Sequence, residues 1–234
     1  VTDTGDRSAI EITTGTENDT VDIVTTGTDS VTEVRTDSGD DDVAVGDTGF
    51  QSGLTISSAA GSDVIGLSDT GSQSVVSIDS SGGVDIVNVQ GTGSSSTTGI
   101  VTGDGSDTIN ITSTADGNRL DPTGNQAGTL DDILGNVVIE GGDQDNEPDF
   151  VGQAEARQTD GDVVSQTVAG TQGDTLNLSD AGNAVGGTYA MNETAFERSS
   201  VQTGIVTFAT VETINLQTST GGDTLAVVST PDEV

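Results

Sequence analysis

The chain has 234 residues and a formal net charge of −34, from 39 acidic residues against five arginines, and it contains no histidine or cysteine. These counts exclude a nucleic-acid partner, because nothing would neutralise the phosphates, and they exclude both a cysteine–histidine zinc site and histidine-based catalysis. No apolar run approaches the roughly 20 residues that a membrane-spanning helix needs, so we expect no membrane insertion.

A 22-residue repeat fills residues 8–112, in five copies that align without gaps. The copies begin at Ser8, Ser30, Ser52, Ser74 and Ser96. Positions 3 and 5 of the repeat, and again positions 14 and 16, are mostly apolar, while Gly, Ser, Thr and Asp fill the intervals. Apolar residues at period two mark short strands with one buried face, and the intervals are rich in turn residues.

A single copy with two short strands cannot bury its apolar face alone, but stacked copies form a continuous aliphatic column. The repeat therefore predicts an all-β fold, a right-handed parallel β-helix (β-solenoid) with 22-residue rungs about 4.8 Å apart. Low hydrophobicity with high net charge would otherwise indicate disorder. The ordered pattern argues against disorder, since it puts the charges outside and buries the few apolar residues.

The register breaks after residue 112, and the next segment reads as a loop followed by "TLDDIL", a possible short helical turn over 129–134. Residues 136–146 restart the rung with Ile139 at position 5, and Asn146 falls where Asp is expected. Residues 147–172 read as an inserted loop. We expect one continuous domain with a regular part (1–112), an irregular part (113–172) and closing rungs (173–234).

In the closing part, Asp174, Leu176 and Leu178 resume the repeat pattern. Further strands are expected around Tyr189, Met191, Ile205 and Phe208, in a wider or capped part of the core that holds most of the aromatic residues. The last stretch predicts Leu216 at position 5, Asp223 at position 12, and Leu225 and Val227 at positions 14 and 16.

The two ends of the chain fall at nearly the same phase of the repeat. Counting back from Ser8 puts Val1 at position 16 and Thr4 at position 19, the positions expected for Val227 and Thr230. This agreement predicts one unit of a tandem array. Open strand edges at both ends favour pairing with another chain, so the expected partner is a second copy, stacked head to tail into a filament.

An aspartate column is the strongest candidate for a functional site. Asp19, Asp41, Asp63, Asp85 and Asp107 share position 12, so stacking would place each about 5 Å from the next. Calcium between the rungs would relieve the repulsion between these carboxylates, because calcium takes carboxylate and carbonyl oxygens as ligands. The full set of candidate ligands is Asp19, Asp37, Asp41, Asp42, Asp63, Asp85, Asp104, Asp107, Asp143, Asp145, Asp174 and Asp223.

Each candidate site has an alternative interpretation. An Asp at a tight turn can accept main-chain N–H bonds and need no metal. The acidic run "DQDNEPD", from Asp143 to Asp149, can bind calcium or form a plain solvated loop. A threonine column at position 19, from Thr26 to Thr114, can be an exposed ice-binding ladder or, as we expect, a hydroxyl ladder at a turn.

Two resemblances follow from these motifs. "TGDGSDTIN", residues 102–110, is similar to the RTX nonapeptide, with Gly103, Gly105, Asp107 and Ile109 matching and Thr102 replacing the first glycine. In RTX β-rolls such turns bind calcium through Asp carboxylates and main-chain carbonyls. RTX rolls take 18 residues per turn, whereas this repeat takes 22.

More of the chain resembles the tandem modules of long surface proteins from planctomycetes and similar marine bacteria. The resemblance rests on "GSDTINI", "GTLDDILGNVVIEGG", "GDTLNLSDAG" and "VETINLQTSTGGDTLAV", in that order. It implies a secreted, calcium-associated, β-helical adhesin or matrix protein without enzymatic activity, located outside the cell or at its surface.

We therefore expect a structural repeat module of an extracellular filament, adhesin or cell-surface matrix, rigidified by Ca²⁺. One alternative is a module that binds a glycan or a cell-surface protein through its inserted loops, with an exposed Phe150 or Tyr189. Another is adaptation to salt without specific calcium, because counterions screen a highly charged surface.

Overall fold

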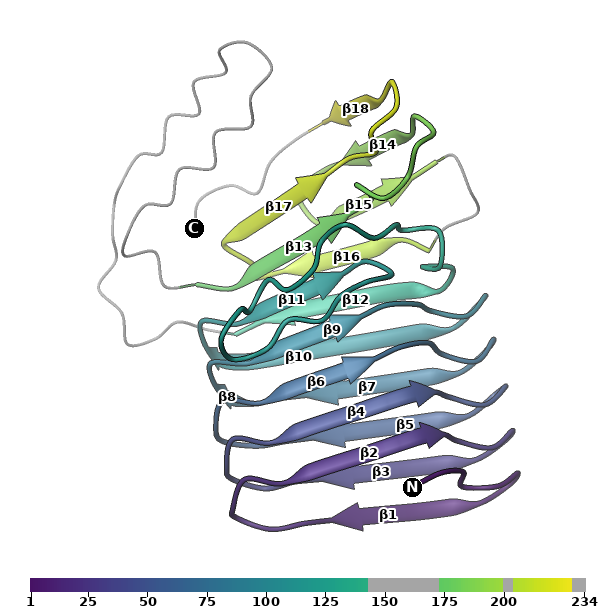
Figure 1. Ribbon diagram of the computed structural model, residues 1–234, viewed down its shortest axis with the longest axis vertical. Helices are drawn as coiled ribbons and strands as arrows, with labels where there is room; N and C mark the ends of the chain where they lie inside the picture. Colours follow the sequence, from purple (N-terminus) through teal and green to yellow (C-terminus); the bar gives the residue numbers. More distant parts are fainter. Residues whose placement is uncertain (143–172, 200–203, 229–234) are drawn as a thin grey trace.

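The computed structural model describes residues 1–142, 173–199 and 204–228, and in these ranges the chain is all β, without helices. The strands form two large sheets, and within each sheet successive strands are stacked along the long axis of the molecule (Figure 1). No helix in the described ranges is long and apolar enough to cross a membrane.

The first sheet has 11 strands in the described residues. In spatial order they are β1 (Ala9–Thr13), β3 (Val31–Arg35), β5 (Gly53–Ser57), β7 (Val75–Asp79), β10 (Thr97–Gly105), β12 (Asn136–Gly141), β16 (Val206–Ala209), β15 (Ala195–Arg198), β14 (Thr188–Met191) and β18 (Thr224–Val227), with β8 (Gly82–Gly83) beside β10. All pairs are parallel except β14 with β15 and β15 with β16.

The second sheet has seven strands in the described residues, all paired in parallel. They are β2 (Thr20–Thr25), β4 (Asp42–Asp47), β6 (Val64–Leu67), β9 (Ile86–Val89), β11 (Thr108–Ile111), β13 (Thr175–Ser179) and β17 (Thr213–Gln217). From β1 to β7 the chain alternates between the sheets, whose strands run in opposite directions in Figure 1.

The pairing register follows the sequence repeat. Val34 pairs with Ile56 in the first sheet, and Val45 pairs with Leu67 in the second, each 22 positions further along. The predicted continuation is also correct where the repeat resumes, because Ile139 pairs with Ile100, and Leu176 pairs with Ile109. The aliphatic columns therefore continue past the irregular segment.

The core lies between the two sheets and is built from these columns. Its members are almost wholly inaccessible: Ile23, Ile56, Ile65, Ile78 and Ile109 are each 0% exposed. Val, Ile and Leu suit this narrow interior because β-branched and aliphatic side chains pack well on pleated strands. Toward the carboxyl end the core includes the buried aromatic residues Tyr189, Phe196 and Phe208.

Glycines at position 10 make the close turn between the first and second sheets possible. Gly61 and Gly83 both have φ near +148°. A Cβ added to Gly61 would lie 1.9 Å from the carbonyl oxygen of Gly39, and one added to Gly83 would lie 1.6 Å from that of Gly61. Only glycine fits this stack, because the main chains of successive repeats touch there.

Residues 113–128 form an irregular segment that we call the strap, and the sequence predicts it correctly as a loop. It lies on the outer face of the second sheet, where Asn88 exchanges hydrogen bonds with the main chain of Gly117, and the Asn110 amide donates to the Pro122 carbonyl. The following residues 129–134 make a hydrogen-bonded turn and a bridge to Thr92, without a helix.

The predicted register of the last strands is wrong. Leu216 pairs with Leu178 in the second sheet, so it occupies position 16 and not position 5. Val227 pairs with Met191 in the first sheet, so the expected phase match between Val1 and Val227 also fails. The physical reason is the β14–β15 hairpin, an antiparallel insertion in the first sheet that the repeat does not contain.

Candidate functional site

The predicted aspartate column exists as a continuous file of buried carboxyls. Each aspartate immediately precedes a strand of the second sheet, at the corner where the chain arrives from the first. Asp41, Asp63 and Asp174 are 0% exposed, and Asp85 and Asp107 are 1% exposed. The column therefore lies inside the corner, where the sequence suggested solvated turns or metal sites between the rungs.

Each carboxylate after Asp19 accepts a hydrogen bond from the preceding aspartate of the file. The main-chain N–H of one aspartate donates to Oδ1 of the next, at 2.7–2.9 Å. The file runs through Asp19, Asp41, Asp63, Asp85, Asp107 and Asp174. It ends at Glu212, whose Oε2 accepts from the Asp174 N–H at 2.6 Å, and the sequence analysis did not identify this residue.

The second oxygen of these carboxyls is left without a partner. Oδ2 of Asp41, Asp63, Asp85 and Asp107 is buried and accepts no hydrogen bond of normal geometry. The hydroxyls of Ser58, Ser80 and Thr102 lie near enough to Asp63, Asp85 and Asp107 to oppose part of the rise in the pKa of these carboxyls. A buried polar atom without a partner costs about 1–3 kcal/mol, so four of them in one file require an explanation.

A row of hydroxyls faces the file from the carboxyl-end region of successive first-sheet strands, directly after β3, β5 and β7 and within β10. Its members are Thr36, Ser58, Ser80 and Thr102, all 0% exposed. The hydroxyls of Thr36, Ser58 and Thr102 have no hydrogen bond of normal geometry, while Ser80 Oγ donates to the Thr102 carbonyl at 3.2 Å. The repeat shows this row at position 7, as polar residues in the column two places after position 5. The corner interior is thus lined by oxygen atoms on both sides.

Burial raises the pKa of the carboxyls in the file, because a low-dielectric environment disfavours the charged form. Desolvation, opposed by main-chain and hydroxyl hydrogen bonds, raises the pKa of Asp85 to about 7 and that of Asp107 to about 8. It raises the pKa of Asp174 to about 6, and it raises that of Asp63 as well. Asp107, and in part Asp85, therefore hold a proton near neutral pH unless another cation takes its place.

The remaining candidate ligands lie apart from the file. Asp37 and Asp104 are exposed on the outer side of the corner. Asp42 is also exposed and pairs with Arg119 of the strap at 2.7 Å. Asp223 accepts from the Gly187 N–H and the Ser219 hydroxyl, near the end of the stack. Asp143 and Asp145, like the rest of the acidic run to Asp149, lie outside the described residues.

The aspartates of the file meet some, but not all, of the requirements of a cation-binding site. Buried carboxylate oxygens without a partner, facing hydroxyl oxygens, form the kind of donor set that hard cations prefer. Yet within the described ranges no group of three or more acidic, histidine or cysteine side chains gathers closely enough to hold a metal ion by itself. A cation there would need hydroxyl, main-chain or water oxygens in addition to the aspartates.

The threonine column at position 19 is a buried hydroxyl ladder except at Thr114, which is half-buried in the strap and donates to the Asn125 carbonyl. Thr26, Thr48, Thr70 and Thr92 are at most 3% exposed, and each Oγ1 accepts the N–H of a glycine in the following repeat. Thr4 does the same for Gly27, which confirms its predicted position. Because these hydroxyls face inward, they do not form the flat exposed array that ice binding would require.

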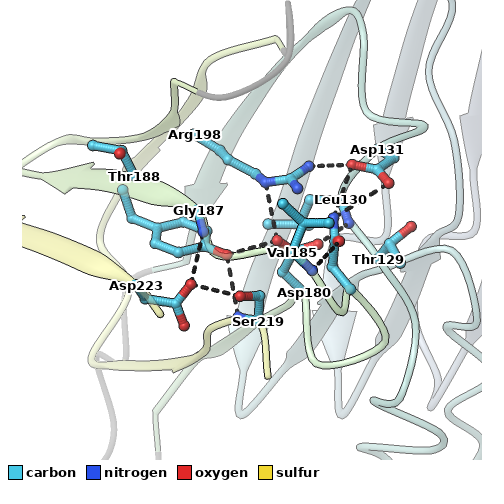
Figure 2. A network of polar contacts seen from close by, with 12 residues as sticks. Thr129, Leu130, Asp131, Asp180, Val185, Gly187, Thr188, Arg198, Ser219 and Asp223 are labelled. Atoms are coloured by element: carbon cyan, nitrogen blue, oxygen red, sulfur yellow. Dashed lines mark hydrogen bonds and ion pairs between the residues drawn. The ribbon is translucent and has the colours of Figure 1, made fainter. Parts of the chain in front are cut away.

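A second buried polar cluster lies toward the carboxyl end of the chain (Figure 2). The sequence did not predict this cluster. Arg198 is 3% exposed, forms an ion pair with Asp131, and places Nε 2.9 Å from Oδ2 of the fully buried Asp180. The Tyr189 hydroxyl donates to the same Asp180 oxygen at 2.7 Å. Asp180 Oδ1 accepts the N–H of Leu130 at 3.0 Å, which ties the hairpin to the turn after the strap.

Electrostatics keep the cluster charged. Burial lowers the pKa of Arg198, but its hydrogen bond to Asp131 and the negative charges of Asp131 and Asp180 outweigh burial and raise it. The guanidinium is therefore the permanent counter-charge for buried Asp180. No sequence signal marks this cluster, because its members come from four separate segments of the chain.

Comparisons with protein-family models, with curated proteins and with solved structures give no significant match to this chain.

Proposed function

We propose that the chain is a right-handed parallel β-helix with 22-residue rungs, serving as a structural module of an extracellular filament, adhesin or cell-surface matrix. In this role the main-chain ladders and the aliphatic columns carry mechanical load. The outward-facing acids keep the module soluble in a salty, calcium-rich exterior. The observation that carries the proposal is the unbroken register of the aspartate file from Asp19 to Asp174.

The register supports a helical path of one rung per repeat. Each strand of the regular part pairs with the strand one repeat later in the same sheet, and the chain visits both sheets within each repeat. Hydrogen bonds also continue at the corner, where Ser38, Ala60 and Gly82 form parallel bridges. Right-handed crossovers dominate among parallel strands, which supports the proposed hand.

The ends of the sheets support head-to-tail assembly with a second copy. Each sheet has edge strands, β1 and β18 in the first and β2 and β17 in the second. Inward-facing Leu225 and Val227 of β18 are 47% and 49% exposed, and within the described residues no strand pairs with the outer edge of β18. An uncovered apolar edge strand is a template for pairing with another chain.

Calcium is proposed as the cation that rigidifies the corner. The support is the row of buried Oδ2 atoms without partners, described above. Carboxylates at the spacing of neighbouring strands repel one another unless a proton or a cation intervenes. At pH 7 and above a divalent ion would compete with the proton for the file.

Tyr189 does not support the alternative that the chain is a binding module. Tyr189 is 0% exposed and stacks on Phe196, with ring centroids 6.2 Å apart, so its ring cannot contact a glycan or a partner protein. Phe150 lies outside the described residues.

Circular dichroism and thermal melting of the purified chain test the proposal. The chain is compared in chelator, in millimolar calcium, in equal magnesium, and in sodium chloride of matched ionic strength. We expect calcium to raise the melting midpoint more than the other salts. If sodium chloride does as well as calcium, screening of the acidic surface explains the composition, and the calcium part of the proposal is wrong.

Sedimentation velocity over a range of concentrations tests assembly. Elongated oligomers that grow with concentration are expected. A monomer at every concentration would contradict head-to-tail pairing of the isolated chain.

A further inference from the structure

The strap holds one arginine that reaches far from its own position in the chain. Arg119 donates from Nη1 to the Asp42 carboxylate at 2.7 Å, from Nη2 to the Asp41 carbonyl at 2.6 Å, and from Nε to the Ser62 carbonyl at 2.6 Å. These acceptors lie just before or at the start of the second-sheet strands β4 and β6. The guanidinium is thus held by oxygens of two neighbouring repeats.

These three oxygens resemble a cation site in composition. One carboxylate and two main-chain carbonyls from adjacent turns are the ligand types that calcium takes in proteins, with water completing the six to eight positions. The structure places a cation among them, but this cation is the guanidinium of Arg119. Burial raises the pKa values of Asp63 and Asp85, and the charge of Arg119 offsets a small part of that rise, which places it within electrostatic reach of the buried file.

The strap is anchored at other points as well. The amide of Gln90 donates to the Ala115 carbonyl at 2.7 Å, and Asn88 and Asn110 hold Gly117 and Pro122. These contacts lie over β9 and β11, whereas Arg119 reaches β4 and β6. Releasing Arg119 therefore frees the short part of the strap between Gly117 and Pro122, while the remaining anchors stay in place.

We propose that Arg119 is a tethered cation that fills an oxygen-lined site formed by Asp42, Asp41 and Ser62, and that a divalent cation competes with it for this site. At low calcium the arginine closes the strap over the corner. At millimolar calcium the ion takes the oxygens, and Arg119 moves into solvent. The inference relies on the proposed calcium-rich setting for its biological meaning, but the competition itself is tested separately.

Trypsin cleavage provides the test, because trypsin must take a free arginine side chain into its pocket. Only five arginines are present. Arg119 is followed by Leu120, which is 97% exposed, so the bond is reachable once the guanidinium is released. Arg7, whose side chain is 84% exposed, serves as the internal reference in the same chain.

Cleavage after Arg119, divided by cleavage after Arg7, is followed by mass spectrometry in chelator and in rising calcium. We expect the ratio to rise saturably by about fivefold or more over the millimolar range, because occupancy of the open state grows with the competing ion. Sodium chloride of matched ionic strength should change it much less. An equal rise in sodium chloride, or no rise in calcium, overturns the proposal.

A pair of variants separates the site from general acidity. Asp42→Asn removes the carboxylate, so the ratio should already be high in chelator and should lose its calcium dependence. Asp22→Asn removes an exposed acid on β2 and should behave as wild type. Equal behaviour of the two variants contradicts the assigned site.

The outcome is independent of the melting test above. A calcium-dependent cleavage ratio with an unchanged melting midpoint supports this competition and contradicts global rigidification by calcium. A raised midpoint with a constant ratio does the reverse.

Discussion

The main-chain N–H of Asp41 donates to Oδ1 of Asp63 at 2.8 Å, although 22 residues separate the two in the chain. The contact repeats up the file, so each carboxyl fixes the position of the preceding repeat. A slip of one residue between repeats would break every such bond and would turn the aliphatic columns outward. The aspartates therefore specify register, whether or not they also hold an ion.

The metal-free protein should lose stability as the pH rises. In the unfolded chain these carboxyls have the usual pKa of 3.8, whereas in the folded chain Asp85 and Asp107 have values of about 7 and about 8. The folded state thus binds protons more tightly, and its advantage is complete below pH 3.8 and lost as the pH passes 7 and 8. We expect a fall on the order of a few kcal/mol in the free energy of unfolding.

Urea titrations in chelator at pH 5, 7 and 9 measure this effect. Calcium should reduce the fall if it replaces the proton in the file. Constant stability from pH 5 to pH 9 in chelator would show that the buried carboxyls are not protonated in the folded state.

Two substitutions of Asp85 should have different effects on the stability of the protein at high pH. Asp85→Asn keeps an oxygen to accept the Asp63 N–H and removes the charge, so at pH 8 in chelator it should be as stable as wild type or more so. Asp85→Ala leaves that N–H unsatisfied and should cost about 1–3 kcal/mol. Thermal melts check this, with Asp22→Asn as the exposed control. An asparagine variant as unstable as the alanine variant would mean that the negative charge itself is needed.

The closely stacked glycines at position 10 of the repeat, such as Gly61 and Gly83, should not tolerate a side chain. In Gly61→Ala the new Cβ would meet the Gly39 carbonyl oxygen at 1.9 Å, at a φ of +148°. We expect a loss of about 3 kcal/mol or failure to fold. Gly53→Ala is the matched control, since its nearest neighbour is Val31 Cγ2 at 4.0 Å, and it should stay within about 1 kcal/mol of wild type. Equal melting midpoints for the two would contradict the close stacking of main chains.

Removing the buried guanidinium should destabilise the carboxyl-terminal part. Arg198→Met leaves Asp180 buried without its counter-charge, at a cost of about 3–5 kcal/mol. Arg35→Gln breaks exposed ion pairs with Glu11 and Glu33 and should cost about 0–1 kcal/mol.

Adding Asp180→Asn to Arg198→Met should restore part of the loss, because the buried charge is then gone. Denaturant titration and hydrogen exchange over β13–β17 give the readout. If the double variant shows no recovery, the destabilisation by Arg198→Met comes from lost packing and not from the unpaired charge of Asp180.

Charging the open edge should weaken assembly. Leu225→Lys puts a charge on the inward face of β18, where a second copy would pack, and it should weaken association by about tenfold or more. Leu120→Lys changes an equally apolar but remote residue on the strap and should leave association unchanged. Sedimentation velocity compares the two, and a similar effect of both would assign association to general charge.

The sequence predicted the regular part well because one physical rule repeats there. Ile56 and Leu67 are recognisable as inward-facing by alternation alone, and the 22-residue spacing carries that assignment to every copy. The Asp column was found for the same reason. Its burial was not, because an acidic residue two places after a turn glycine is typical of a solvated turn.

Two features could not be predicted from the sequence, because they depend on contacts between distant segments of the chain. Arg119 reaches Asp42 across 77 residues, and Arg198 reaches Asp131 across 67, with no periodicity to reveal either contact. The register of Leu216 failed for a related reason. The β14–β15 hairpin inserts antiparallel strands, and a repeat rule has no way to count them.

Asp107 and Asp174 are neighbours in the file although 67 residues separate them, about three times the usual interval. The N–H of Asp107 still finds its carboxylate at 2.9 Å, as if no sequence had been added. The file thus keeps its hydrogen-bond pattern across a connection about three times as long as one repeat. A foreign segment grafted into the connection between Asp107 and Asp174 should therefore leave the register of the file unchanged. The stacked repeats would then serve as a rigid scaffold that displays the inserted segment.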